Sequence, residues 1–143
     1  KSSRFQMPDQ FIPMKTAEAW QLSNPPIMAL APLLASLEIF HEAGMDNLLF
    51  KSHRLTEYLE QLILSRLIGK IKIITPKNPR DRGCQLSLRL LYPINNIMNR
   101  LNNVGIISDW REPDVIRIAP VPLYNSFEDC FLFVEYLEYI LNE

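Results

Sequence analysis

The stretch DVIRIAPVPLYNSFED, residues 114–129, combines the signals of a strand, a corner and a helix start. Val115, Ile116 and Ile118 form a short β-branched run that is typical of strands, and two prolines then end it. Arg117 lies inside this run. Because arginine is rarely buried without an anionic partner, the run predicts either a structural carboxylate in this chain or a bound ligand.

A helix is predicted directly after the prolines. Asn125–Glu128 and Ser126–Asp129 both have the spacing of a capping box, and acidic residues are favoured in the first turn of a helix. We expect this helix to continue to the C-terminus. Its predicted inward face comprises Phe127, Phe131, Val134, Leu137 and Leu141.

Upstream, hydrophobic periodicity predicts three more helices and three more strands. The helices are expected over residues 27–43, 45–67 and 93–104, and the strands over 71–76, 83–91 and 105–109. Because these elements lack regular βαβ alternation, the order indicates an α+β domain of two layers. We expect a mostly antiparallel sheet of three to four strands, with helices on one face. Residues 1–24 are predicted to form an extended arm or loop, and residues 25–143 the domain.

The predicted helix over residues 27–43 is apolar nearly all round, which indicates that several of its sides are covered. Pro32 falls early in it and is expected to bend the helix or delay its regular start. The preceding SNPP, residues 23–26, has two interpretations. Asn24 is either a helix cap or an amide side chain on a rigid mount.

Composition excludes several classes of function. The 143 residues are 48% hydrophobic and 22% charged, with a net charge of −1, so a packed core is expected and a basic nucleic-acid-binding face is not. The most apolar segment is too short and interrupted to span a membrane. Cys84 and Cys130 match no metal-binding pattern, and no secretory signal is evident, so a reducing cytoplasmic setting is expected.

Few residues indicate chemistry by pattern alone. His41 and His53 have no metal-ligand spacing, no serine or cysteine has a recognisable base, and the glycines form no phosphate-binding loop. Arg117 is the strongest candidate, because guanidinium suits bidentate capture of a carboxylate. A structural salt bridge is the alternative, since strands often carry an arginine on their open face.

Three blocks of sequence together resemble the C-terminal part of the kynureninases. They are AWQLSNPPIMALAPLLASLEIFHEAGM (19–45), IITPKNPRDRGCQLSL (73–88) and REPDVIRIAPVPLYNSFEDC (111–130), and the likeness begins at SRFQM (3–7). Kynureninases are a branch of the aspartate-aminotransferase-like, fold type I enzymes that use pyridoxal 5'-phosphate. The resemblance implies the small C-terminal domain of such an enzyme.

The resemblance also implies an activity and its residues. Kynureninases hydrolyse L-kynurenine or 3-hydroxykynurenine to L-alanine and an anthranilate, in tryptophan catabolism and NAD biosynthesis, as cytoplasmic homodimers. By this likeness Arg117 binds the substrate α-carboxylate, and Ser23 and Asn24 face the substrate's aromatic end. No lysine here matches the family's Schiff-base motif, so the cofactor is expected on a large domain upstream and the chain alone is expected to be inactive. The alternatives are a free-standing amino-acid-binding module or another fold type I enzyme.

Overall fold

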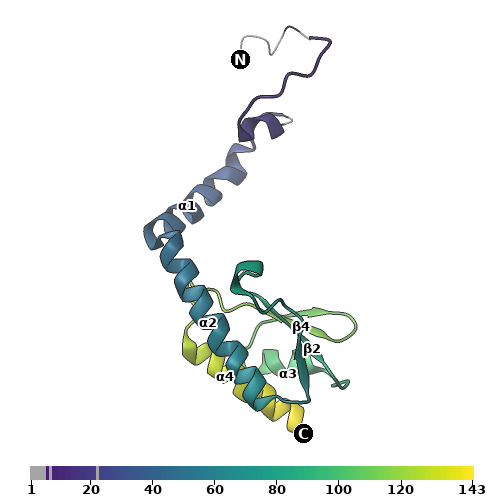
Figure 1. Ribbon diagram of the computed structural model, residues 1–143. Coiled ribbons are helices and arrows are strands. Elements are labelled where there is room, and N and C mark those ends of the chain that lie inside the picture. The colour runs from purple at the N-terminus through teal and green to yellow at the C-terminus, as the bar shows by residue number, and fades with distance from the viewer. Residues whose placement is uncertain (1–5, 7, 22) are drawn as a thin grey trace. The chain divides into compact units, whose positions relative to one another are not determined.

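The structure is a computed structural model that describes residues 6, 8–21 and 23–143 (Figure 1). The chain divides into two compact units, Lys1–Phe40 and His41–Glu143, and each is considered by itself. This division falls later than the boundary expected from the sequence between residues 24 and 25, which stays a prediction.

The first unit holds a 3-10 turn, η1 (Ala17–Trp20), and most of helix α1 (Ile27–Ala43). The 3-10 turn lies within the expected arm or loop, of which residues 1–5, 7 and 22 lie outside the described residues. Helix α1 has the bounds predicted, and Pro32 lies within it without delaying its start. Within the described residues of the first unit, all side chains of this helix from Ile27 to Phe40 are exposed, and the expected cover on several sides stays a prediction.

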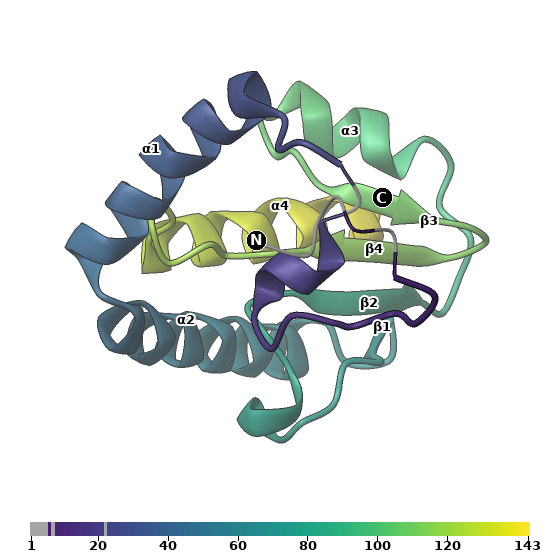
Figure 2. The ribbon, with the colours of Figure 1, turned by 90° about the horizontal axis from the view of Figure 1, so that it is seen from above.

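The second unit is a two-layer α+β domain, as expected. Its four-stranded antiparallel sheet has the order β1-β2-β4-β3 (Figure 2). The strands are β1 (Ile71–Ile73), β2 (Leu86–Leu90), β3 (Asp109–Arg111) and β4 (Val115–Ile118). The helices are α2 (Met45–Arg66), α3 (Ile97–Asn103) and α4 (Phe127–Asn142), and a short 3-10 turn, η2 (Pro79–Asp81), lies between β1 and β2.

Strand alternation separates an inner from an outer face of the sheet. Leu86, Leu88 and Leu90 of β2 are buried, as are Ile116 and Ile118 opposite them on β4. These side chains pack against α2 and α4, which lie side by side in both ribbon views and contribute the rest of the core. The outer face carries the polar residues of the same strands, and it is on this face that Arg117 lies.

The strand predicted over residues 105–109 is wrong, because the observed strand begins at Asp109. Gly105 takes a positive φ of 80° and the Ile106 N–H donates to Leu101 O, so these residues complete the end of α3. Ile107 is consequently 93% exposed. Helix α3 is also shorter than the predicted 93–104, since Asn96 adopts a left-handed conformation just before it.

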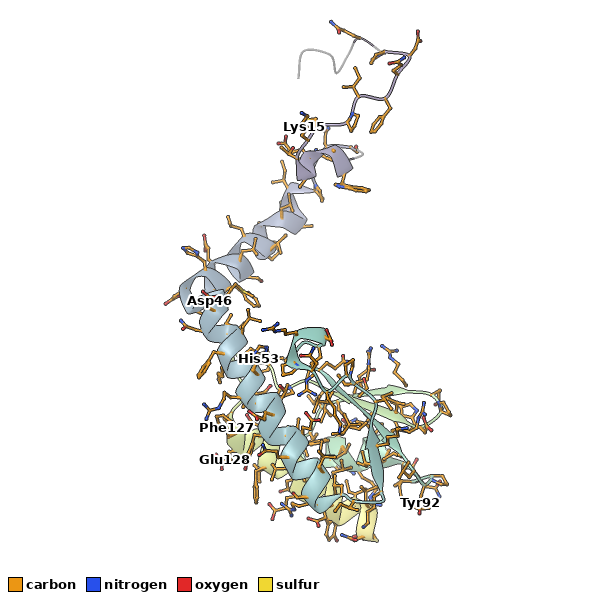
Figure 3. The ribbon with its side chains drawn as sticks, in the orientation of Figure 1. Lys15, Asp46, His53, Tyr92, Phe127 and Glu128 are labelled. Carbon is orange, nitrogen blue, oxygen red and sulfur yellow. The ribbon has the colours of Figure 1, made fainter. Side chains whose placement is uncertain are left out.

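The inward face of α4 was only partly predicted. Ser126 caps this helix through the expected capping box with Asp129. Val134 and Leu137 are buried as predicted, but Phe127, labelled at the helix start in Figure 3, and Phe131 are exposed. The core side of α4 is instead formed with three further buried residues, Cys130, Phe133 and Ile140.

Among the described residues no single helix is long and apolar enough to cross a membrane. Only α1 and α2 taken together have the length and apolar composition of a membrane span, and Gly44 interrupts that pair.

Candidate functional site

Arg117 is held by a carboxylate of the neighbouring strand. Asp109 on β3 lies directly opposite Arg117 on β4, and Arg117 Nε donates to Asp109 Oδ2 at 2.6 Å. Arg117 Nη2 donates to the same oxygen. The side chain is 33% exposed, so it is neither buried nor fully solvated. The anionic partner that the sequence required is therefore present within the chain.

This pairing leaves part of the guanidinium open. A guanidinium has five N–H donors in a fixed planar fork, and Asp109 uses the edge formed by Nε and Nη2. The second edge, formed by Nη1 and the other Nη2 hydrogen, has no hydrogen-bond acceptor among the described residues. That edge has the geometry for bidentate binding of a further carboxylate. The structure thus accommodates both predicted roles of Arg117, a structural pair and a ligand site.

Positive charge exceeds negative charge around this pair. Arg111 Nη2 lies 3.1 Å from Asp109 Oδ2, so one carboxylate stands between two guanidinium groups. The hydrogen bond from Arg117 is the largest cause that lowers the pKa of Asp109, and the charge of Arg111 lowers it further. Asp109 therefore stays ionised at neutral pH. The cluster has a net charge of +1 and attracts an anion.

Ser23 and Asn24 lie in the first unit, whereas Arg117 lies in the second. Both residues are exposed, and Ser23 O accepts a hydrogen bond from Gln21 Nε2 at 2.6 Å. Pro26, rather than Asn24, directly precedes the first residue of α1. A site that joins these two residues to Arg117 stays a prediction.

Pyridoxal phosphate requires an amine, an acid against the pyridinium nitrogen and a phosphate cradle. Lys51 Nζ donates to Pro122 O at 2.8 Å, and Lys70 Nζ donates to Leu141 O at 3.2 Å. The other described lysines, one of which is Lys15 (Figure 3), are exposed, and in the described ranges no lysine is ion-paired with a carboxylate. These residues do not fit the cofactor, and the part of the chain that is described also holds no cluster of metal ligands.

The sequence did not reveal Asp109 as the partner of Arg117. The two residues are eight positions apart on either side of a tight turn, and this pairing depends on the hairpin register. Since the strand before the turn was predicted four residues too early, Asp109 fell at its end rather than opposite Arg117. A hairpin centred on residues 112–114 is the signal that would have placed it opposite Arg117.

A second arginine that the sequence did not single out is more deeply buried than Arg117. The side chain of Arg82, in the loop between β1 and β2, is only 4% exposed, and its Nη2 lies 2.7 Å from Glu60 Oε2 on α2. Its Nη1 donates to Pro76 O at 3.1 Å. This ion pair anchors the loop to α2, and the loop borders the outer face of the sheet.

Comparison with known proteins identifies the relatives of this chain. Residues 48–137 match the family model described as the kynureninase C-terminal domain. A kynureninase of Xanthomonas campestris is 55% identical over 139 residues, which is 95% of this chain and 33% of that protein. A kynureninase of Stenotrophomonas maltophilia is 52% identical over 141 residues. The chain spans about a third of the length of the curated relatives that it matches.

Proposed function

This chain belongs to the kynureninase C-terminal domain family, and from that premise we propose that it provides the substrate α-carboxylate site of a kynureninase. The observation that supports this proposal most directly is the open edge of Arg117. Asp109 fixes the plane of the guanidinium by two hydrogen bonds and leaves a bidentate donor pair facing away from itself. A prealigned donor pair binds a carboxylate without first losing side-chain freedom.

The proposed reaction is hydrolysis of L-kynurenine, or of 3-hydroxykynurenine, to L-alanine and the corresponding anthranilate. Arg117 would hold the α-carboxylate and so fix the direction of the Cα–H bond, which accelerates a reaction by orientation rather than by proton transfer. Ser23 and Asn24 would face the aryl ketone end of the substrate. Hydrogen bonds there would reject analogues that lack the matching groups.

Pyridoxal 5'-phosphate belongs to this proposal as a cofactor of the whole enzyme. Since the described residues of this chain do not fit it, we assign its binding to the two thirds of the relatives that this chain does not match. We also propose that the enzyme acts in the cytoplasm as a homodimer. This chain alone is then expected to bind the amino-acid end of the substrate and not to turn it over.

A chimera tests the function. This chain replaces the matching third of the Xanthomonas campestris kynureninase, and anthranilate fluorescence is followed after L-kynurenine is added in the presence of pyridoxal phosphate. The proposal is supported if the chimera turns over L-kynurenine and the same kynureninase lacking its C-terminal third does not. A folded chimera that binds the cofactor and L-kynurenine but releases no anthranilate contradicts it, and favours an amino-acid-binding module instead.

A further inference from the structure

Ser87 lies beside Arg117 on the side opposite Asp109. In the pairing of β2 with β4, Ser87 lies directly opposite Arg117. In the pairing of β3 with β4, Asp109 lies directly opposite Arg117 on its other side. The buried residues Leu86 and Leu88 flank Ser87, so its side chain points to the outer face. Asp109, Arg117 and Ser87 therefore form one row across three adjacent strands.

The backbone of Ser87 shows that it is close to Arg117. Its N–H donates to Thr75 Oγ1 at 2.7 Å and its carbonyl accepts from Ile74 N at 2.9 Å, so both groups point away from β4. Ser87 and Arg117 are therefore a non-hydrogen-bonded pair of the antiparallel ladder. In such pairs the Cα atoms are about 4.5 Å apart and the side chains come closest.

The Ser87 hydroxyl has a proton to donate. Among the described residues, its one hydrogen bond is as an acceptor, from Gln85 Nε2 at 3.4 Å, which is long for such a bond. Within the described part of the chain its proton has no acceptor. Ser87 also lines an open recess of about 370 Å³ between the β1–β2 loop and the sheet. The loop wall of this recess is anchored by Arg82, and Arg117 is not among the residues that line the recess.

We propose that Ser87 is a second substrate-binding residue, whose hydroxyl donates a hydrogen bond to the same α-carboxylate that the open edge of Arg117 binds. This inference rests on the proposed function and adds a residue to its site. Asp109 orients the guanidinium from one side, and Ser87 completes the carboxylate site from the other. Because the hydroxyl oxygen accepts from Gln85 Nε2, the hydroxyl proton is not used in that contact.

The test compares two compounds in the chimera described above. L-Kynurenine carries the carboxylate, and the amine formed by its decarboxylation does not. Ser87→Ala should raise KM for L-kynurenine roughly tenfold, the effect of one hydrogen bond to a charged group, and leave the inhibition constant of the amine unchanged. Ser87→Thr keeps the hydroxyl and should restore KM. Ser65→Ala, which removes an exposed hydroxyl on α2, is the matched control and should change neither constant.

The outcomes separate this inference from the proposed function. If Arg117→Ala raises KM for L-kynurenine and Ser87→Ala does not, the function stands and the role of Ser87 is overturned. If Ser87→Ala weakens both compounds equally, its effect is structural and the inference again fails. If the chimera is inactive, both compounds are titrated into the 143-residue chain by NMR, where Ser87→Ala must weaken L-kynurenine alone.

Discussion

Removing Arg82 is expected to destabilise the second unit strongly. The Arg82 side chain is 4% exposed and that of Glu60 is 15% exposed, so the ion pair at 2.7 Å is largely shielded from water. Arg82→Ala leaves the Glu60 carboxylate without its partner, and breaking a buried pair from one side costs about 3–5 kcal/mol. Because Glu60 keeps some contact with water, we expect about 3 kcal/mol, the lower end of that range.

Urea unfolding of the 143-residue chain, followed by circular dichroism, measures this cost. The unfolding midpoint should fall while the slope with urea stays constant, because the change affects stability and not the surface exposed. Arg80→Ala, two residues away and exposed, is the control and should cost less than about 0.5 kcal/mol. The double variant Arg82→Met/Glu60→Met should lose less than the two single variants together, since neither charge is then left alone. A loss below about 1 kcal/mol for Arg82→Ala, or strict additivity in the double variant, would refute a shielded pair.

Three further predictions concern the ends of the sheet and α4. Ser126→Ala removes the hydroxyl that accepts from the Asp129 N–H and should lower the free energy of unfolding by about 1–2 kcal/mol, measured with urea. An unchanged unfolding midpoint would mean that this cap does not stabilise α4. The pKa of Asp109 is lowered from 3.8 in the folded chain, so its ionised form contributes stability above that value, and this contribution is lost as the pH falls through the folded pKa. Asp109→Asn should therefore make the fall of the urea midpoint below about pH 4 less steep. A pH profile identical to that of the unchanged chain would contradict this. Burial raises the pKa of the Cys130 thiol to about 11. A thiol reagent at pH 8 should therefore modify the half-buried Cys84 in the folded chain and Cys130 only after unfolding. Rapid modification of both cysteines in the folded chain would contradict the burial of Cys130.

The sequence predicted the elements with a strong period and missed those fixed by pairing. Leu86, Leu88 and Leu90 alternate with polar residues, so β2 and its buried face were readable directly. Residues 105–109 also contain a pair of β-branched residues, Ile106 and Ile107, but Gly105 completes the end of α3 and the strand starts only at Asp109. No local pattern distinguishes these two uses of an apolar segment, because the choice depends on the hairpin register with β4.

The candidate site was predicted in the same uneven way. Its position inside an apolar strand identified Arg117 as a candidate, and the prediction that it pairs with an anion was confirmed. The sequence left open which anion this is, because Asp109 becomes the neighbour of Arg117 only when the hairpin closes. Arg82 was missed because PRDRG, residues 79–83, has the composition of a solvated loop. Its burial arises from Glu60 on α2, 22 residues earlier in the chain.

We propose that the open edge of Arg117 binds the carboxylate of an amino-acid substrate. The most direct measurement is the effect of Arg117→Ala in the chimera on two constants, KM for L-kynurenine and the inhibition constant of the decarboxylated amine. We predict that KM rises by roughly a hundredfold or more, as expected when a charge-assisted bidentate contact is lost, while the inhibition constant of the amine does not rise. Equal weakening of both compounds, or no change in either, would contradict the assignment of Arg117 to the carboxylate.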